Sequence, residues 1–168
     1  MSPMTVRELE LAAFEPYGTF TQMADNPRIM AVLPRPVVFR PDMIQMQLGD
    51  STTASFSICR VEPRDLVITG GEYHNKASEG ILPLDGDILI HVAPPTSPRL
   101  GIPVDQFEVY RVPAGTMVVL RPGVWHGAPW PAGTDPVNVL VVLPVRTYAI
   151  DSTSIRLEPE QQIPFTAA

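Results

Sequence analysis

Cysteine and long apolar runs are scarce in this sequence. Cys59 is the single cysteine in 168 residues and cannot form an internal disulfide, so nothing indicates an oxidising compartment. No apolar stretch approaches the roughly 20 residues of a transmembrane helix, and acidic side chains stand where a signal peptide has its apolar core. We therefore expect a cytoplasmic protein with no membrane partner.

Basic residues are also few. Lysine and arginine together number 12 against 18 aspartates and glutamates, which gives a formal net charge of −6. Lys76 is the only lysine. Because the chain lacks the basic patch of a nucleic-acid-binding protein, we expect no nucleic-acid partner.

Apolar residues and proline are plentiful. An apolar fraction of 45% is typical of a globular protein, and the length fits a single domain over residues 1–168. The 20 prolines disfavour helices. The one predicted helix covers residues 5–13, where Thr5 is a candidate N-cap and Glu8 completes a capping box.

Every segment after Tyr17 is predicted to be extended, because runs of β-branched and aromatic residues alternate with Pro, Gly and Asp turns. Many short strands in this pattern indicate an all-β sandwich or barrel. The run 137–145 is apolar on both faces and is predicted to be central and doubly covered. A further apolar strand, 37–40, needs a cover, which favours a homodimer formed through edge strands. The other predicted strands are 54–61, 65–69, 87–93, 107–112 and 116–120.

Four ionisable side chains are predicted to converge on one point inside the barrel. Glu72 and His74 share one face of a strand, Glu79 returns to that side after a tight connection, and His126 follows a Pro-Gly turn. These four residues are the catalytic and metal-ligand candidates. Two imidazoles and two carboxylates suit a divalent ion such as Mn, Fe, Ni or Zn with positions left open for substrate. Without a metal, the same groups suit general acid–base catalysis.

The spacing of these residues resembles the two motifs of the cupin superfamily. The first motif is matched by Glu72-x-His74 followed by Glu79 and Gly86, and the second by PGVWH at 122–126. This resemblance implies a cupin-type β-barrel, a double-stranded β-helix or jelly roll, with few short helices.

Several separate stretches are also similar to the ureidoglycolate lyase family, which has a barrel of this type. They are FEPYG at 14–18, CRVEP at 59–63, EYH at 72–74, LPLDG at 82–86 and VWH at 124–126. The resemblance implies an enzyme that splits ureidoglycolate, a small carboxylate from the breakdown of purines through allantoin, into glyoxylate and urea.

The same resemblance implies roles for individual side chains. Arg60 would clamp the substrate carboxylate, since its planar fork matches a carboxylate. Tyr17 lies in the first family-like stretch and is a substrate-binding candidate. The charge of Lys76 would attract an anionic substrate, although an exposed turn lysine is the simpler interpretation. Trp125 would wall the pocket or serve only in packing.

Other functions remain open at this point. Glu79 stands where the family often has glutamine, and its extra negative charge favours a metal. This feature supports a metal-dependent cupin enzyme acting on another oxo-acid or sugar acid. A cupin that binds a small metabolite without catalysis is a third possibility. His91 lies within an apolar strand and is predicted to be a core histidine and not a ligand.

Overall fold

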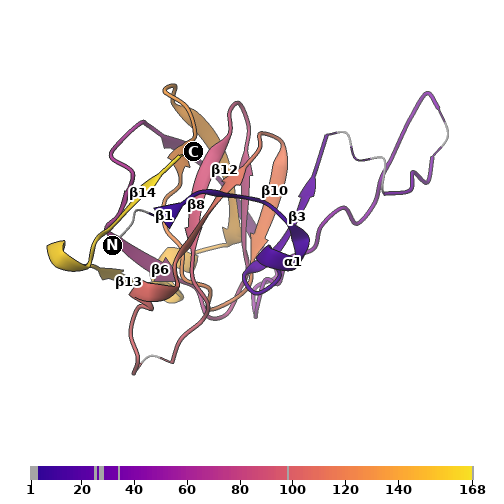
Figure 1. Ribbon diagram of the computed structural model, residues 1–168. Coiled ribbons are helices and arrows are strands. Elements are labelled where there is room, and N and C mark those ends of the chain that lie inside the picture. The colour runs from indigo at the N-terminus through magenta and orange to yellow at the C-terminus, as the bar shows by residue number, and fades with distance from the viewer. Residues whose placement is uncertain (1–3, 25, 27–28, 34, 98, 168) are drawn as a thin grey trace.

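The computed structural model describes residues 4–24, 26, 29–33, 35–97 and 99–167. Strands dominate this part of the chain (Figure 1), and the helices described are two single turns, α1 (Leu11–Phe14) and α2 (Thr147–Ile150), and two 3-10 turns at Val104–Gln106 and Pro159–Gln161. The prediction of an all-β fold with few short helices is confirmed. Neither described α-helix has the length and apolar character needed to cross a bilayer.

Two larger sheets form the body of the fold. One has five strands in the order β3-β10-β7-β12-β4, and the other has four in the order β11-β8-β9-β2. Two smaller sheets, β1-β14-β5 and β13-β6, lie beside them. The strands are β1 Met4–Thr5, β2 Arg7–Glu8, β3 Gly18–Gln22, β4 Ala54–Val61, β5 Val67–Ile68, β6 Gly70–Tyr73, β7 Glu79–Pro83, β8 Ile88–Val92, β9 Glu108–Val112, β10 Thr116–Leu120, β11 Trp130–Pro131, β12 Val137–Pro144, β13 Thr153–Arg156 and β14 Ile163–Thr166.

The alternation of side chains along β8 divides the core into two parts. Ile88, Ile90 and Val92 belong to a first apolar cluster, to which the five-stranded sheet also contributes. Leu89 and Ala93 point to the opposite face and belong to a second cluster, shared with residues of β5 and β14. Each such fully buried side chain stabilises the fold by roughly 1.5–3 kcal/mol. β8 is therefore covered on both faces.

Two of the predicted strands, 54–61 and 116–120, coincide with β4 and β10. The strands predicted at 65–69, 87–93 and 107–112 are present but shorter. The run 137–145 forms β12, which pairs with both β7 and β4, although Leu140 on it is only half-buried.

The predicted helix over residues 5–13 is wrong. Its first half forms β1 and β2, which pair in parallel with β14 and β9, and only α1 remains helical. Pairing with strands remote in sequence satisfies more backbone groups and lets Met4 and Val6 pack on the second cluster, so tertiary contacts outweigh a local capping signal.

The predicted strand at 37–40 is also wrong. These residues lie in the extension between β3 and β4, which projects from the barrel in Figure 1, and they form no regular strand. Val37 and Phe39 are more than half exposed, at 58% and 53%. The apolar composition of this segment therefore does not reflect a buried strand of the barrel.

Candidate active site

The structure brings three of the four predicted side chains together. Glu79 begins β7, His74 follows β6, and His126 lies in a segment that pairs with β6 through an isolated bridge to Glu72. Glu79 Oε2 is 3.1 Å from His74 Nε2 and 3.0 Å from His126 Nε2. All three side chains are buried, with 2%, 8% and 4% of the surface of His74, Glu79 and His126 exposed. We call this group the His–Glu–His centre.

Backbone carbonyls orient both imidazoles. His74 Nδ1 lies 2.6 Å from the carbonyl oxygen of Asp151, and His126 Nδ1 lies 2.9 Å from that of Val124. A carbonyl only accepts, so each Nδ1 carries the proton and donates it, which leaves the lone pair of each neutral ring on Nε2. This second-layer hydrogen bond is typical of histidines that bind metals.

A cation fits the space between these atoms. His74 Nε2 is close to Glu79 Oε2 but lacks hydrogen-bonding geometry, so it is a buried polar atom without a hydrogen-bond partner. Lone pairs on two nitrogens and a carboxylate oxygen repel one another unless a proton or a cation lies among them. One ligand atom from each of the three residues lies within 4.8 Å of the others, a distance that a single metal ion can bridge. Two histidines and one carboxylate are a common ligand set for a divalent ion.

Burial and mutual charge decide the protonation of the centre. Burial alone would raise the pKa of Glu79, but the charge and hydrogen bond of His126, together with the close approach of His74, outweigh it and hold the pKa at about 2. Burial acts to lower the pKa of both histidines, yet the net pKa of each is raised, mainly by Glu79. Glu79 is therefore an ionised carboxylate, and the centre attracts either protons or a metal.

Glu72 lies near the centre but does not join it. Its carboxylate accepts hydrogen bonds from the hydroxyl of Ser152, just before β13, at 3.3 Å and from that of Ser154, on β13, at 3.5 Å. Among the described residues, the group able to hold a metal consists of the other three side chains. The sequence placed Glu72 on the correct strand, but its side chain leans towards β13.

Sequence reasoning missed the turn that covers the centre. The ring of Tyr148, on α2, lies edge-on to His74 with ring centres 6.0 Å apart. Tyr148 is 63% exposed, but the part of it that lies against the centre is shielded from water, and this partial burial, followed by the charges of Glu79 and Glu72, raises the pKa of Tyr148 to about 12. The hydroxyl therefore stays protonated and can donate a hydrogen bond. The sequence has no motif for this residue, because only the fold brings α2 against His74.

The four predicted substrate-binding residues lie elsewhere. None of them forms a hydrogen bond or ion pair with the His–Glu–His centre in the described chain. Arg60 is exposed and lies 3.4 Å from Glu62. Lys76 is an exposed turn residue, while Trp125 and Tyr17 are buried packing residues at 2% and 7% exposure.

Their surroundings explain these positions. Trp125 donates from Nε1 to Thr96 Oγ1 at 2.8 Å and packs against Tyr73, on the face of its segment opposite His126. Tyr17 packs edge-on to Tyr110 within the first cluster. These contacts give both aromatic residues a structural role.

His91 is the core histidine that the sequence predicts. Its Nε2 lies 3.2 Å from the Gly70 carbonyl, and only 3% of the residue is exposed. Burial lowers its pKa to about 3, with smaller contributions from the charges of His126 and Arg64. His91 is therefore neutral at physiological pH.

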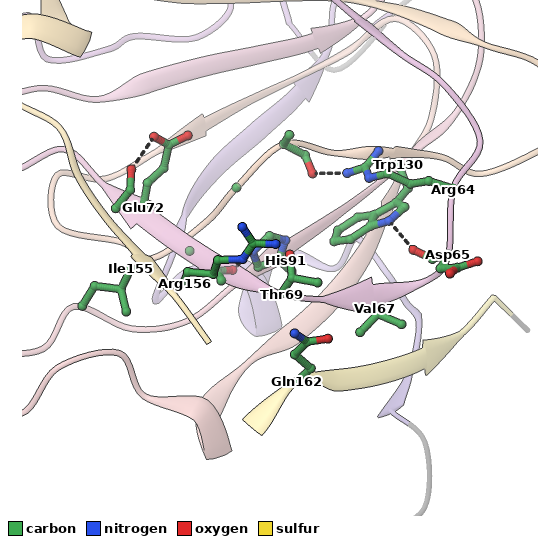
Figure 2. Close-up of a pocket in the computed structure, with 15 residues that line it drawn as sticks. Arg64, Asp65, Val67, Thr69, Glu72, His91, Trp130, Ile155, Arg156 and Gln162 are labelled. Atoms are coloured by element: carbon green, nitrogen blue, oxygen red, sulfur yellow. Dashed lines mark hydrogen bonds between the residues drawn. The ribbon is translucent and has the colours of Figure 1, made fainter. Parts of the chain in front are cut away.

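A groove of about 830 Å³ lies near the centre, but His74, Glu79 and His126 are not among the described residues that line it. Figure 2 shows Glu72 at one end, Arg64 and Trp130 at the other, and His91 and Arg156 between them. Glu72 exchanges two backbone hydrogen bonds with His126, of 2.7 and 2.9 Å, so the wall of the groove is the backbone that carries a residue of the centre.

Comparison with known proteins identifies a family. The sequence profile of the ureidoglycolate lyase family matches residues 1–163. A search of curated proteins found no match.

Two kinds of solved structure are similar to the fold at low sequence identity. A dTDP sugar isomerase from Desulfovibrio desulfuricans G20 is 17% identical with a TM-score of 0.48, over 89% of this chain and 88% of that one. A mutant of Bacillus subtilis oxalate decarboxylase is 16% identical with a TM-score of 0.43, over 62% of this chain. The match spans only 24% of the oxalate decarboxylase chain.

Proposed function

Because the chain belongs to the ureidoglycolate lyase family, a family of carbon–nitrogen lyases, we propose that it splits ureidoglycolate into glyoxylate and urea at the His–Glu–His centre. The observation that carries this proposal is the convergence of two Nε2 atoms on one buried carboxylate oxygen, at 3.0 and 3.1 Å. A small carboxylate substrate suits such a centre, since the buried cation or protons there attract an anion.

We propose that His74, Glu79 and His126 hold a divalent ion, with Mn, Fe, Ni and Zn as the candidates. Bound there, the ion would act as a Lewis acid on an oxygen of the substrate. A metal would take the place of the protons that the raised pKa values of His74 and His126 favour, so its binding should release protons.

The reaction itself requires two proton movements. The hydroxyl proton of ureidoglycolate leaves, its oxygen forms the C=O of glyoxylate, and the C–N bond breaks with its electrons on nitrogen. That nitrogen then takes up one proton to give urea. Glu72 is outside the group able to hold a metal and exchanges backbone hydrogen bonds with His126, which supports a role as the base that takes the hydroxyl proton and returns it to the nitrogen.

Tyr148 has a complementary role in this scheme. Its hydroxyl stays protonated because its pKa is raised to about 12, first by burial and then by Glu79 and Glu72. It would donate a hydrogen bond to the ureido oxygen, where negative charge grows as the C–N bond breaks. Tyr148 therefore stabilises the departing group, while Glu72 moves the proton.

The test is to incubate metal-replete protein with racemic ureidoglycolate and to follow glyoxylate, urea and ammonia separately. Equal amounts of glyoxylate and urea without ammonia are expected. His126→Ala should abolish turnover, whereas Glu72→Gln and Tyr148→Phe should lower kcat by about 10²-fold or more and by about tenfold, respectively.

Asp135→Ala, an exposed turn variant, is the matched control and should retain full activity. Ammonia in place of urea would indicate hydrolysis of the ureido group and contradict the lyase scheme. Full activity in folded His126→Ala would show that the chemistry takes place elsewhere.

We also propose that the protein is a cytoplasmic homodimer acting in purine breakdown. Support for the dimer comes from β4, an edge strand of the five-stranded sheet, where Phe56 and Ile58 are 69% and 60% exposed. Apolar side chains on an unpaired edge favour association. Light scattering should give twice the chain mass of 18.4 kDa, and Phe56→Asp should reduce it to the monomer value.

A further inference from the structure

The extension between β3 and β4 carries an apolar surface that its own chain leaves uncovered. Its described residues within 29–40 fold back on themselves, since the N–H of Val32 donates to the carbonyl of Phe39 at 2.9 Å and Arg40 Nε donates to that of Ile29 at 3.1 Å. We call this segment the hairpin. None of its described residues belongs to either apolar cluster of the barrel, from which the extension projects in Figure 1. Six apolar residues of the hairpin are between 46% and 81% exposed: Met30, Val32, Leu33, Val37, Val38 and Phe39.

The outer face of the five-stranded sheet is a second apolar surface. Phe56 and Ile58 on β4 point away from the barrel interior, because Cys59 between β4 and the first cluster packs inward and side chains alternate along a strand. Ile58 pairs with Leu140 on β12, and Leu140 pairs with Leu82 on β7. Paired residues lie on the same face of a sheet, so a half-buried to exposed apolar row crosses three strands. We call this row, with Phe56, the outer face.

The sizes of the two surfaces favour contact between the hairpin and the outer face. Partly exposed apolar residues offer on the order of 100 Å² each, which gives the hairpin roughly 600 Å² and the outer face roughly 300 Å². In a two-fold dimer each contact occurs twice, so packing one surface on the other would cover about 900 Å² on each copy. A standard interface covers about 800 Å² per partner, whereas two outer faces packed together would cover only about 300 Å².

The base of the extension is anchored to the barrel. The N–H of Ser78 donates to the carbonyl of Gln47 at 2.8 Å, and the N–H of Gln47 donates to Ser78 Oγ at 3.2 Å. Ser78 is buried, with 3% of its surface exposed. This anchor limits where the hairpin can lie, and a restrained segment loses less entropy when it docks.

We propose that the hairpin of one copy packs on the outer face of a second copy, and that the contact is reciprocal. The occupant is a second copy because one chain supplies both surfaces, each of the area that the other lacks for a stable interface. The inference rests on the homodimer of the proposed function and deepens it, since it names the two surfaces that meet.

Light scattering of Phe39→Asp tests the part of the hairpin. A charge at this 53% exposed position spares the fold but would be buried in the dimer, so the dimer dissociation constant should rise about 100-fold or more. Leu100→Asp is the matched control, because Leu100 is 78% exposed and lies outside both surfaces. It should keep the dimer mass, twice the 18.4 kDa of the chain.

Cross-linking tests which surfaces meet. Two variants with a single cysteine each, Phe39→Cys and Ile58→Cys in a Cys59→Ser background, are mixed, left to exchange subunits and treated with a bismaleimide. A covalent dimer should form in the mixture and in neither variant alone. A covalent dimer of Ile58→Cys alone would indicate that two outer faces pack together, and one of Phe39→Cys alone that two hairpins do; either result would overturn the proposal.

The outcomes also separate this proposal from the homodimer on which it rests. A dimeric wild type whose mass is unchanged by Phe39→Asp would refute the exchange of hairpins and leave the homodimer in place. A monomeric wild type would remove both. The lyase assay is independent of either result, because it follows products and not mass.

Discussion

At the scale of single residues, burial and partners decide which histidines are reactive. His126 and His91 are both almost fully buried, at 4% and 3% exposure. His126 faces the carboxylate of Glu79 and has a raised pKa, whereas His91 faces a carbonyl and apolar rings and its pKa falls to about 3. The same side chain thus favours a proton or a cation in one place and stays neutral in the other.

His91 makes the free energy of unfolding depend on pH. Its unfolded-state pKa is about 6.5 and its folded-state pKa about 3, so the unfolded chain binds a proton first as pH falls. The contribution of neutral His91 to the free energy of unfolding is fully present above pH 6.5 and is lost progressively as the pH falls from 6.5 to 3. The free energy of unfolding should fall by about 2 kcal/mol from this residue between pH 7 and pH 5.

Urea unfolding of the wild type and of His91→Gln at both pH values measures this contribution. Glutamine keeps a donor for the Gly70 carbonyl and does not titrate. The wild type should lose more stability than the variant, and the difference isolates His91 from other titrating groups. Equal losses in both proteins would show that His91 is protonated in the folded state.

At the scale of elements, α2 and the residue after it hold the centre in place. The carbonyl of Asp151 accepts from His74, and its carboxylate accepts from the backbone N–H groups of Asn75 and Lys76 at 2.9 and 2.8 Å. The connection between β6 and β7 is thereby tied to the end of α2. One residue orients an imidazole and fixes the loop that precedes Glu79.

Asp151→Ala should therefore weaken the centre without removing any of its three residues. Loss of the two bonds to backbone N–H groups frees the loop after His74, and we expect metal affinity to fall about tenfold, in the range seen for outer-layer partners. Metal affinity is measured by competition with a chelating dye, and Asp135→Ala on an exposed turn is the control. An unchanged affinity would limit Asp151 to a role in loop stability.

At the scale of the whole molecule, a bound metal should stabilise the fold, because its ligands come from three separate segments that only the folded chain brings together. The melting temperature should rise on adding the preferred ion among Mn, Fe, Ni and Zn and fall on adding a chelator. His126→Ala should lose this response. If no ion raises the melting temperature of the wild type more than that of the variant, the centre works as a metal-free acid–base pair.

The sequence by itself determined the strand content, most strand positions in the middle of the chain, and the two histidines that the fold brings to Glu79. Alternation of apolar residues and Pro-Gly turns are local properties, so β4 and β10 are found without a structure. The spacing of His74, Glu79 and His126 relative to the glycine turns can likewise be read directly from the sequence. Family membership follows from the same local motifs.

Only the tertiary structure decided which neighbours of these motifs belong to the site. Glu72 leans towards β13, Tyr148 covers His74, and Arg64 instead of Arg60 lines the groove, because each outcome depends on pairing between strands far apart in sequence. The N-terminal strands show the same effect, since their partners β9 and β14 lie more than a hundred residues away along the chain. A local pattern specifies an element, but the direction of a polar side chain is set by what packs against it.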